Sequence, residues 1–378
     1  MLGYKYKEII AALVCCHGIP ISLRHLKKRL RGMNLTKRNY LEQESEISDV
    51  IAAILNEVQG SGQCLGYRSM WRKLKLNYGL FVKRDTVLEL MWLIDPRGVN
   101  RRKAKRLLRR KYSSPGPCYT WHVDGYDKLK PFGFAIHGAI DGFSRRILWL
   151  KVGVTNNNPS VIADYYLRCI EQLKCTPRIL RCDLRTENSM LKILQPLFRY
   201  HCDDKFAGMN SIILGKSTSN QRIEAWWSIL RKQNTDWWMS YFRGLRSEGI
   251  YHDGNPLHVE SLRFCFIKII QSELDQVMKE WNTHVISSKR NAEGPSGKPD
   301  IMFFNPEVYN TSSFGTHVDN EEVDACREVL AIHSTEGISC TPEFVQLVDE
   351  IYPNTAQPTT VEEGLRLFLM LTHLLGEL

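Results

Sequence analysis

The sequence predicts an α/β core between a helical front and a helical tail, and three observations lead to this class. Apolar residues recur every three or four positions up to about Lys111, as in amphipathic helices. Strand-like alternation begins directly after the linker Ser113-Ser114-Pro115-Gly116-Pro117. Helical periodicity returns from Leu257 onward. We therefore expect a front at residues 1–112, a core at 117–250, an extension of the core at 251–306 and a tail at 307–378.

Length and composition fit a chain that folds around two or three cores. The 378 residues are 43% hydrophobic and 24% charged, which argues against wholesale disorder. The net charge of +10 is unevenly divided: +15 in residues 1–111, +6 in residues 112–306 and −11 in residues 307–378. A strongly basic front fits a polyanionic partner such as DNA. Ordinary solvated helix faces are the alternative explanation.

The cysteines and the apolar runs exclude several other classes. Eleven cysteines form no CxxC pair and no Cys/His quartet, so we expect no structural zinc site. Scattered thiols are typical of a reducing compartment. The first twelve residues lack the uninterrupted apolar core of a signal peptide, and the run Leu365–Leu375 is too short to cross a bilayer. We expect a soluble intracellular protein that has no membrane partner.

The front contains a pair of helices that resembles a helix-turn-helix. One helical run follows Gly66, and a second begins at Arg84 after the turn Asn77-Tyr78-Gly79. A simple packed helical hairpin has the same pattern, but the charge favours DNA binding. A basic run follows at residues 101–111. The candidate DNA-binding residues of the front are Arg84, Arg101, Arg102, Lys103, Lys105 and Arg106.

The core begins with three strands, predicted at residues 120–126, 133–140 and 146–152. Asp141-Gly142 marks a tight turn between the second and third strands, so the three should form an antiparallel meander. A helix at 160–173, a short buried strand at 178–182 and a helix at 187–198 follow. Three antiparallel strands followed by helix, strand and helix is the order of the ribonuclease-H-like fold.

Three carboxylates occupy positions where they are costly unless they bind a cation or accept hydrogen bonds. Asp124 lies inside the first strand, Asp183 directly follows the buried strand, and Glu224 lies near the start of a helix at residues 219–232. Together they suit phosphoryl transfer with two divalent ions, Mg²⁺ or Mn²⁺. Each residue alone has a simpler explanation, because an Asp after a strand is more often a turn or helix cap.

The helix that carries Glu224 has a polar and an apolar face. Gln221, Glu224, Ser228 and Arg231 share one stripe, and Ile223, Trp227 and Leu230 lie along the other side. Basic residues of this helix, Arg222, Arg231 and Lys232, are further DNA-binding candidates. The tryptophans at 226, 227, 237 and 238 can stack on unpaired bases, although core packing is the favoured role.

Several motifs taken jointly make residues 119–240 resemble the integrase core domain of retroviral and gypsy-type integrases and DDE transposases, in an animal transposon-derived branch. The motifs are Trp121-His122-Val123-Asp124-Gly125, Asp141-Gly142-Phe143-Ser144-Arg145-Arg146, Asp183 with Thr186-Glu187-Asn188, and Ser219-Asn220-Gln221-Arg222-Ile223-Glu224. Segments near Glu280–His284 and Gly294–Asp300 resemble the stretch that follows the core in that branch. The front resembles the helix-turn-helix of some bacterial insertion elements.

The resemblance implies a DDE triad of Asp124, Asp183 and Glu224 that binds two Mg²⁺ or Mn²⁺ ions for DNA strand transfer. It also implies DNA as partner, a homo-oligomer on DNA ends, a nuclear location and no small-molecule substrate. The interval from Asp183 to Glu224 is 41 positions, somewhat longer than in retroviral integrases, and an extra segment at residues 201–216 explains it.

The sequence departs from the family pattern at Arg185, where this branch has glycine two residues after the second aspartate. Glycine there allows a positive φ or close approach to DNA, so an arginine should be strained and should crowd the metal site. This leaves two main hypotheses: a strand transferase, or a catalytically inactive DNA-binding protein with an integrase core as scaffold. A ribonuclease-H-type nuclease is a third, which the DNA-reading front disfavours. We expect His122 to face away from Asp124, and the acidic tail either to bind a partner or to shield the basic front.

Overall fold

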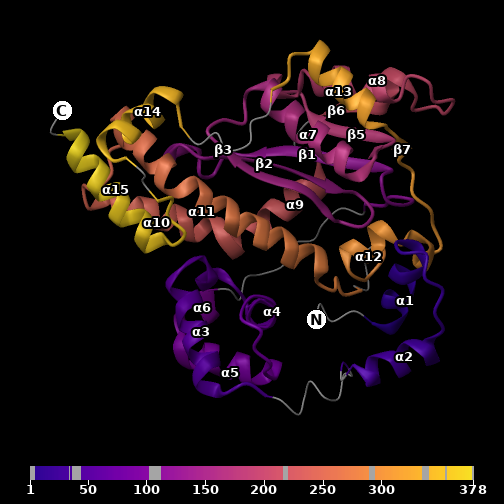
Figure 1. Ribbon diagram of the computed structural model, residues 1–378, viewed down its shortest axis with the longest axis horizontal. Coiled ribbons are helices and arrows are strands. Elements are labelled where there is room, and N and C mark those ends of the chain that lie inside the picture. The colour runs from indigo at the N-terminus through magenta and orange to yellow at the C-terminus, as the bar shows by residue number, and fades with distance from the viewer. Residues whose placement is uncertain are drawn as a thin grey trace.

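The computed structural model places a five-stranded sheet between two layers of helices, with a separate group of helices below it (Figure 1). The structure describes residues 5–33, 35, 44–101, 112–215, 220–288, 294–333, 340–353 and 356–376. Within these residues, no helix is both long enough and apolar enough to cross a membrane.

The front forms two groups of helices. One group is the pair α1 (Tyr6–Cys15) and α2 (Leu23–Gly32). The other has its own apolar core and contains α3 (Ile47–Gln59), α4 (Tyr67–Asn77), α5 (Arg84–Ile94) and α6 (Pro96–Arg101). Val50, Ile54, Met70, Leu74 and Val87 are fully buried in that core, because each lies on the apolar stripe of its helix.

The sheet has the strand order β3-β2-β1-β5-β6. The strands are β1 (Thr120–Tyr126), β2 (Ala135–Asp141), β3 (Ile147–Gly153), β5 (Ile179–Asp183) and β6 (Ile212–Gly215). The first three pair antiparallel, and β5 pairs parallel with both β1 and β6. The predicted meander and the fourth strand are confirmed.

Helices cover both faces of the sheet. On one face lie α7 (Pro159–Leu173), α8 (Leu191–Phe198) and, from the tail, α13 (Asn320–Val329). On the other lie α9 (Gln221–Leu230), the π-helical turn η6 (Arg231–Thr235), α10 (Asp236–Ser247) and α11 (Pro256–Thr283). The remaining helices are α12 (Pro299–Phe304), α14 (Pro342–Ile351) and α15 (Val361–Gly376), and a small second sheet joins β4 (Cys175–Thr176) to β7 (Thr316–His317).

Two amide side chains of α11 cover the free edge of the sheet. Asn282 accepts a hydrogen bond from Ile147 N (2.8 Å) and donates one to Ile147 O (2.9 Å). Gln271 does the same along the strand, accepting from Val152 N (2.9 Å) and donating to Leu150 O (3.1 Å). An exposed edge offers unpaired backbone groups to other chains, and α11 therefore closes this one.

The acidic tail packs on the core rather than on the basic front. Phe344 and Val348 of α14 and Leu367, Phe368 and Leu371 of α15 belong to the same apolar cluster as α10 and α11. Figure 1 shows α14 and α15 against α10 and α11, away from α1 and α2. Shielding of the front is thus not what the tail does in this structure.

Several elements were missing from the sequence prediction, among them β6 and α14. The segment at residues 201–216, interpreted as an insertion, contains β6, which forms the outer parallel strand. The tail contains α14, for which the sequence analysis predicts no helix of its own. The predicted helix at residues 187–198 begins later, at Leu191, because residues 186–188 form a single 3₁₀ turn.

Candidate functional site

The first two carboxylates of the proposed triad lie on neighbouring parallel strands. His122 of β1 is paired with Arg181 of β5, and continuing that register sets Asp124 opposite Asp183. Both side chains are buried, with 8% and 6% of their surfaces exposed. The backbone alone therefore brings the two carboxylates together at the carboxyl end of β5.

Helix α9 reaches this point through a tryptophan. Trp227 Nε1 donates a 2.9 Å hydrogen bond to Asp124 Oδ2. Gly138 lies opposite Asp124 on β2, and a Cβ there would come within 2.8 Å of the Trp227 ring. The missing side chain of Gly138 thus makes room for the indole. Glu224 lies one turn before Trp227 on the same helix, half-buried, and completes the three carboxylates.

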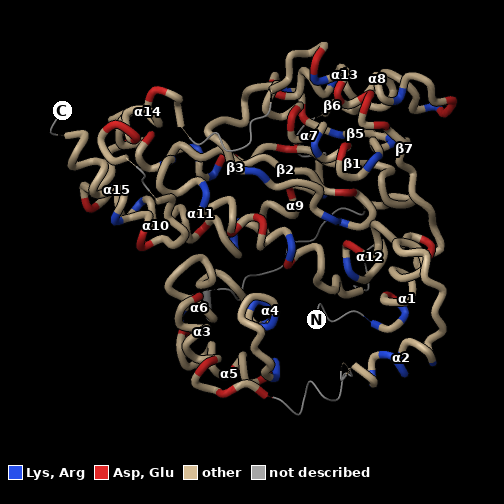
Figure 2. The backbone as a smooth tube through the Cα atoms, viewed as in Figure 1, with Lys and Arg blue, Asp and Glu red and all other residues tan. Residues whose placement is uncertain are grey.

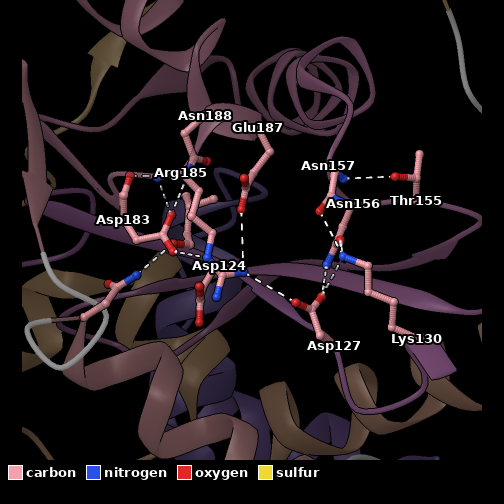
Figure 3. Close-up of polar contacts among 12 residues, drawn as sticks. Asp124, Asp127, Lys130, Thr155, Asn156, Asn157, Asp183, Arg185, Glu187 and Asn188 are labelled. Carbon is pink, nitrogen blue, oxygen red and sulfur yellow. Dashed lines mark hydrogen bonds and ion pairs between the residues drawn. The ribbon is translucent and has the colours of Figure 1, made fainter.

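Arg185 lies among the carboxylates (Figure 3). Its Nε is 3.1 Å from Asp183 Oδ2, and its Nη1 is 3.4 Å from Asp127 Oδ2 and 3.9 Å from Glu187 Oε1. Asn188 Nδ2 holds the other oxygen of Asp183, Oδ1, at 2.8 Å. The guanidinium therefore supplies positive charge to three carboxylates at once, while 54% of its side chain remains exposed.

The backbone of Arg185 is unstrained. Its φ of −68° and ψ of 160° lie in the ordinary extended region. The expectation of strain at this position is wrong, because this backbone does not need a glycine. The expectation of crowding at the carboxylates is confirmed by the contacts of Arg185 with Asp183 and Glu187.

The carboxylates influence one another's ionisation. Burial raises the pKa of Asp124 to about 7; Glu224 and Asp183 act in the same direction, whereas the Trp227 hydrogen bond and Arg185 oppose them. Burial also raises the pKa of Glu224, with Arg185 lowering it and Asp183 raising it.

The residues present do not fit a pair of divalent ions in this arrangement. Both oxygens of Asp183 already have a partner in the chain, Arg185 and Asn188, and one oxygen of Asp124 accepts from Trp227. Among the residues that the structure describes, no three His, Cys, Asp or Glu side chains are arranged to hold a metal ion. The Arg185 guanidinium contacts one of the three carboxylates to which the family resemblance assigns the ions, Asp183.

A comparison with protein families matches residues 111–307, just over half of the chain, to the integrase core domain. The chain belongs to the integrase core domain family. The mixed α/β architecture and its central sheet are those of the ribonuclease-H-like integrase core, so the predicted fold class is confirmed. At the family level the protein is integrase- or transposase-like, and integrase core domains typically use divalent metals. A search of curated proteins finds no match.

His122 faces the same side of the integrase core sheet as Asp124, so the expectation that it faces away is wrong. Residues two apart on a strand share a face, and both contact the α9 side. His122 Nε2 is hydrogen-bonded to Tyr112 (2.7 Å), and Nδ1 is bonded to Asn220 (2.7 Å), the residue that precedes α9. The ring thus positions the start of the helix that carries Glu224.

Few of the predicted DNA-binding residues are free in this structure. Arg84 stacks over the Trp71 ring at 4.4 Å, and Arg222 stacks over the Tyr112 ring at 4.2 Å and donates to Gly142 O. Arg231 is exposed but pairs with Asp236 at 3.0 Å, and Lys232 is exposed. Arg101 ends α6, whereas Arg102, Lys103, Lys105 and Arg106 lie outside the described residues.

The tryptophans have the packing role that the sequence favours. Trp226, Trp227 and Trp238 are buried in the cluster beneath α11, and Trp237 stacks on Tyr241 with ring centroids 5.1 Å apart. Sequence reasoning missed Asp127 and Glu187 as partners of Arg185. Asp127 lies three residues after Asp124, and Glu187 lies four residues after Asp183 within one of the motifs that resemble the family.

Proposed function

We propose that this integrase core protein binds DNA and that Arg185 takes the place of the divalent ions, so that the chain does not join DNA strands. The observation that carries the proposal is the ion pair between Arg185 Nε and Asp183 Oδ2 at 3.1 Å. A fixed positive charge at this position repels Mg²⁺ or Mn²⁺ and occupies carboxylate oxygens that the ions need.

Helix α2 supports DNA binding. Arg24, Lys27, Lys28, Arg29 and Arg31 are all exposed on this ten-residue helix, and none has an ion pair within the described part of the chain. Figure 2 shows Lys and Arg residues along α2. The cations of α4 are engaged instead: Lys73 pairs with Glu57 at 2.8 Å, and Arg72 donates to Glu280 O. Uncompensated cations on one helix are what the DNA backbone binds. Helix α5, the second helix of the predicted helix-turn-helix, exposes Asp85, Glu89 and Leu93 and suits DNA less well.

Metal-dependent strand transfer is the second candidate, and one observation favours it. Asp124, Asp183 and Glu224 are electrostatically coupled, as a DDE triad requires. For this candidate, the half-exposed Arg185 side chain has to turn away so that the three carboxylates can hold Mg²⁺ or Mn²⁺. Binding of DNA ends by a homo-oligomer and a nuclear location accompany either candidate.

A paired assay distinguishes the two candidates. DNA binding is measured as a function of salt, and strand transfer is measured on end-like oligonucleotides with Mn²⁺. We expect salt-sensitive binding and no joined product. Joined product that disappears in Asp124→Asn, Asp183→Asn and Glu224→Gln would refute the inactive proposal and establish strand transfer. Absence of any salt-sensitive DNA binding would refute both candidates.

A further inference from the structure

A basic cavity lies beside the carboxylates. Its volume is about 470 Å³, and it is lined by Asp127, Lys128, Pro131, Phe132, Arg231, Met239, Arg243 and Arg246. Four cations and one carboxylate face this space, so its net charge is positive. We call it the basic pocket.

Two of the four cations are already held by the fold. Arg246 pairs with Asp253 at 2.8 Å, donates to Pro131 O at 3.3 Å and lies over the Phe132 ring at 5.0 Å. Arg231 pairs with Asp236 at 3.0 Å. These contacts fix the wall of the pocket. Each of these two arginines therefore has a carboxylate partner within the chain.

The other two cations have no such partner. Lys128 and Arg243 are exposed, and neither forms an ion pair within the residues that the structure describes. They come from separate elements, since Lys128 follows β1 and Arg243 belongs to α10. Two uncompensated cations that converge on one pocket from different elements leave a positive charge that an anion can neutralise.

The pocket adjoins the acidic site. Asp127 belongs to both, because it lines the pocket and also pairs with Arg185 at 3.4 Å. Lys128 is close enough to Glu224 to oppose the rise that burial causes in the pKa of that carboxyl. A DNA strand that passes the carboxylates would therefore have a neighbouring backbone phosphate within reach of the pocket.

We propose that the basic pocket binds a phosphate of the DNA backbone, with Lys128 and Arg243 as its ligands and Arg246 as its wall. This inference rests on the proposed DNA-binding function and deepens it by locating one contact. Guanidinium and ammonium groups from two elements suit a phosphate diester, since each can donate to a different non-bridging oxygen. The contact is with the backbone, so it carries no base specificity.

The test compares two double variants of the full chain. Lys128→Gln with Arg243→Gln removes the unpaired cations of the pocket. Lys268→Gln with Arg366→Gln removes the same charges from exposed positions on α11 and α15, so it controls for net charge. The affinity for a duplex oligonucleotide is measured by fluorescence anisotropy at several salt concentrations, and thermal unfolding confirms that both variants fold as the wild type does.

We expect the pocket variant to bind DNA about tenfold more weakly. The magnitude of its slope of log K against log salt should fall by about 0.9, since the pocket neutralises one phosphate. The slope of log K against log salt should be nearly the same for the control variant as for the wild type. If wild-type chain binds DNA and the pocket variant keeps its slope, the pocket inference is overturned and DNA binding stands. If wild-type chain shows no salt-sensitive binding, DNA binding itself fails.

Discussion

Replacing Arg185 with glutamine should make the stability of the chain sensitive to Mn²⁺. The guanidinium lies 3.1 Å from Asp183 and is 54% exposed, so solvent screens the pair strongly. Opposite charges about 4 Å apart interact by about 1 kcal/mol in water. Without metal, Arg185→Gln should therefore lose up to about 1 kcal/mol of unfolding free energy. With Mn²⁺ at about a hundred times its dissociation constant, the variant should gain about 2.7 kcal/mol.

Thermal unfolding with and without Mn²⁺ measures this difference. A control is Arg231→Gln, which breaks the pair with Asp236 at 3.0 Å; the Arg231 side chain is 49% exposed, against 54% for Arg185. That pair lies outside the three carboxylates, so its loss should not create a response to the metal. If the wild type is stabilised by Mn²⁺ as much as Arg185→Gln, the arginine does not compete with divalent ions and the reasoning fails.

Three further predictions concern the rest of the fold. Asn282→Ala should lower the unfolding free energy by about 2 kcal/mol, because it leaves the backbone N–H and C=O of Ile147 unpaired. The control variant Asn77→Ala removes an exposed hydrogen bond to Gln276 and should cost less than about 1 kcal/mol. Burial lowers the pKa of His137 to about 3, so below about pH 6.5 the unfolded chain binds a proton that the native state does not. Between about pH 7 and about pH 5.5 the wild type should thus lose about 1 kcal/mol more stability than His137→Gln in chemical unfolding, and equal losses would contradict the assignment. The Sγ atoms of Cys118 and Cys175 are 3.9 Å apart, so oxidation by diamide should join this pair in a disulfide before any other. Diamide takes up the two electrons and two protons that the thiols release. Peptide mapping that finds a different disulfide first would refute this.

The sequence predicted the parts of the core that long periodic segments specify. The meander, α7, α9 and α11 have enough residues for their patterns to be unambiguous, and α9 does place Glu224 on its half-buried side. Strand β6 was missed because its four residues are too few for an alternating pattern, and its partner β5 is far away in the sequence.

The candidate site was predicted in its residues but not in its contacts. Asp124, Asp183 and Glu224 follow from position on strands and helix, whereas the hydrogen bond from Trp227 depends on the space left by Gly138 on another strand. The strain expected at Arg185 was wrong, because the residue type does not determine φ at a position that merely resembles a glycine site. Such contacts depend on the packing of distant elements, which local patterns do not encode.

Direct measurement of Mn²⁺ binding tests the role of Arg185 most sharply. The electron paramagnetic resonance signal of free Mn²⁺ is recorded during titration of the wild-type chain and of the triple variant Asp124→Asn, Asp183→Asn, Glu224→Gln. We expect the two chains to leave the signal equally intact, because Arg185 already pairs with Asp183, and we expect Arg185→Gly to reduce the signal. Wild-type chain that removes two equivalents of Mn²⁺ from solution while the triple variant removes none would contradict this expectation.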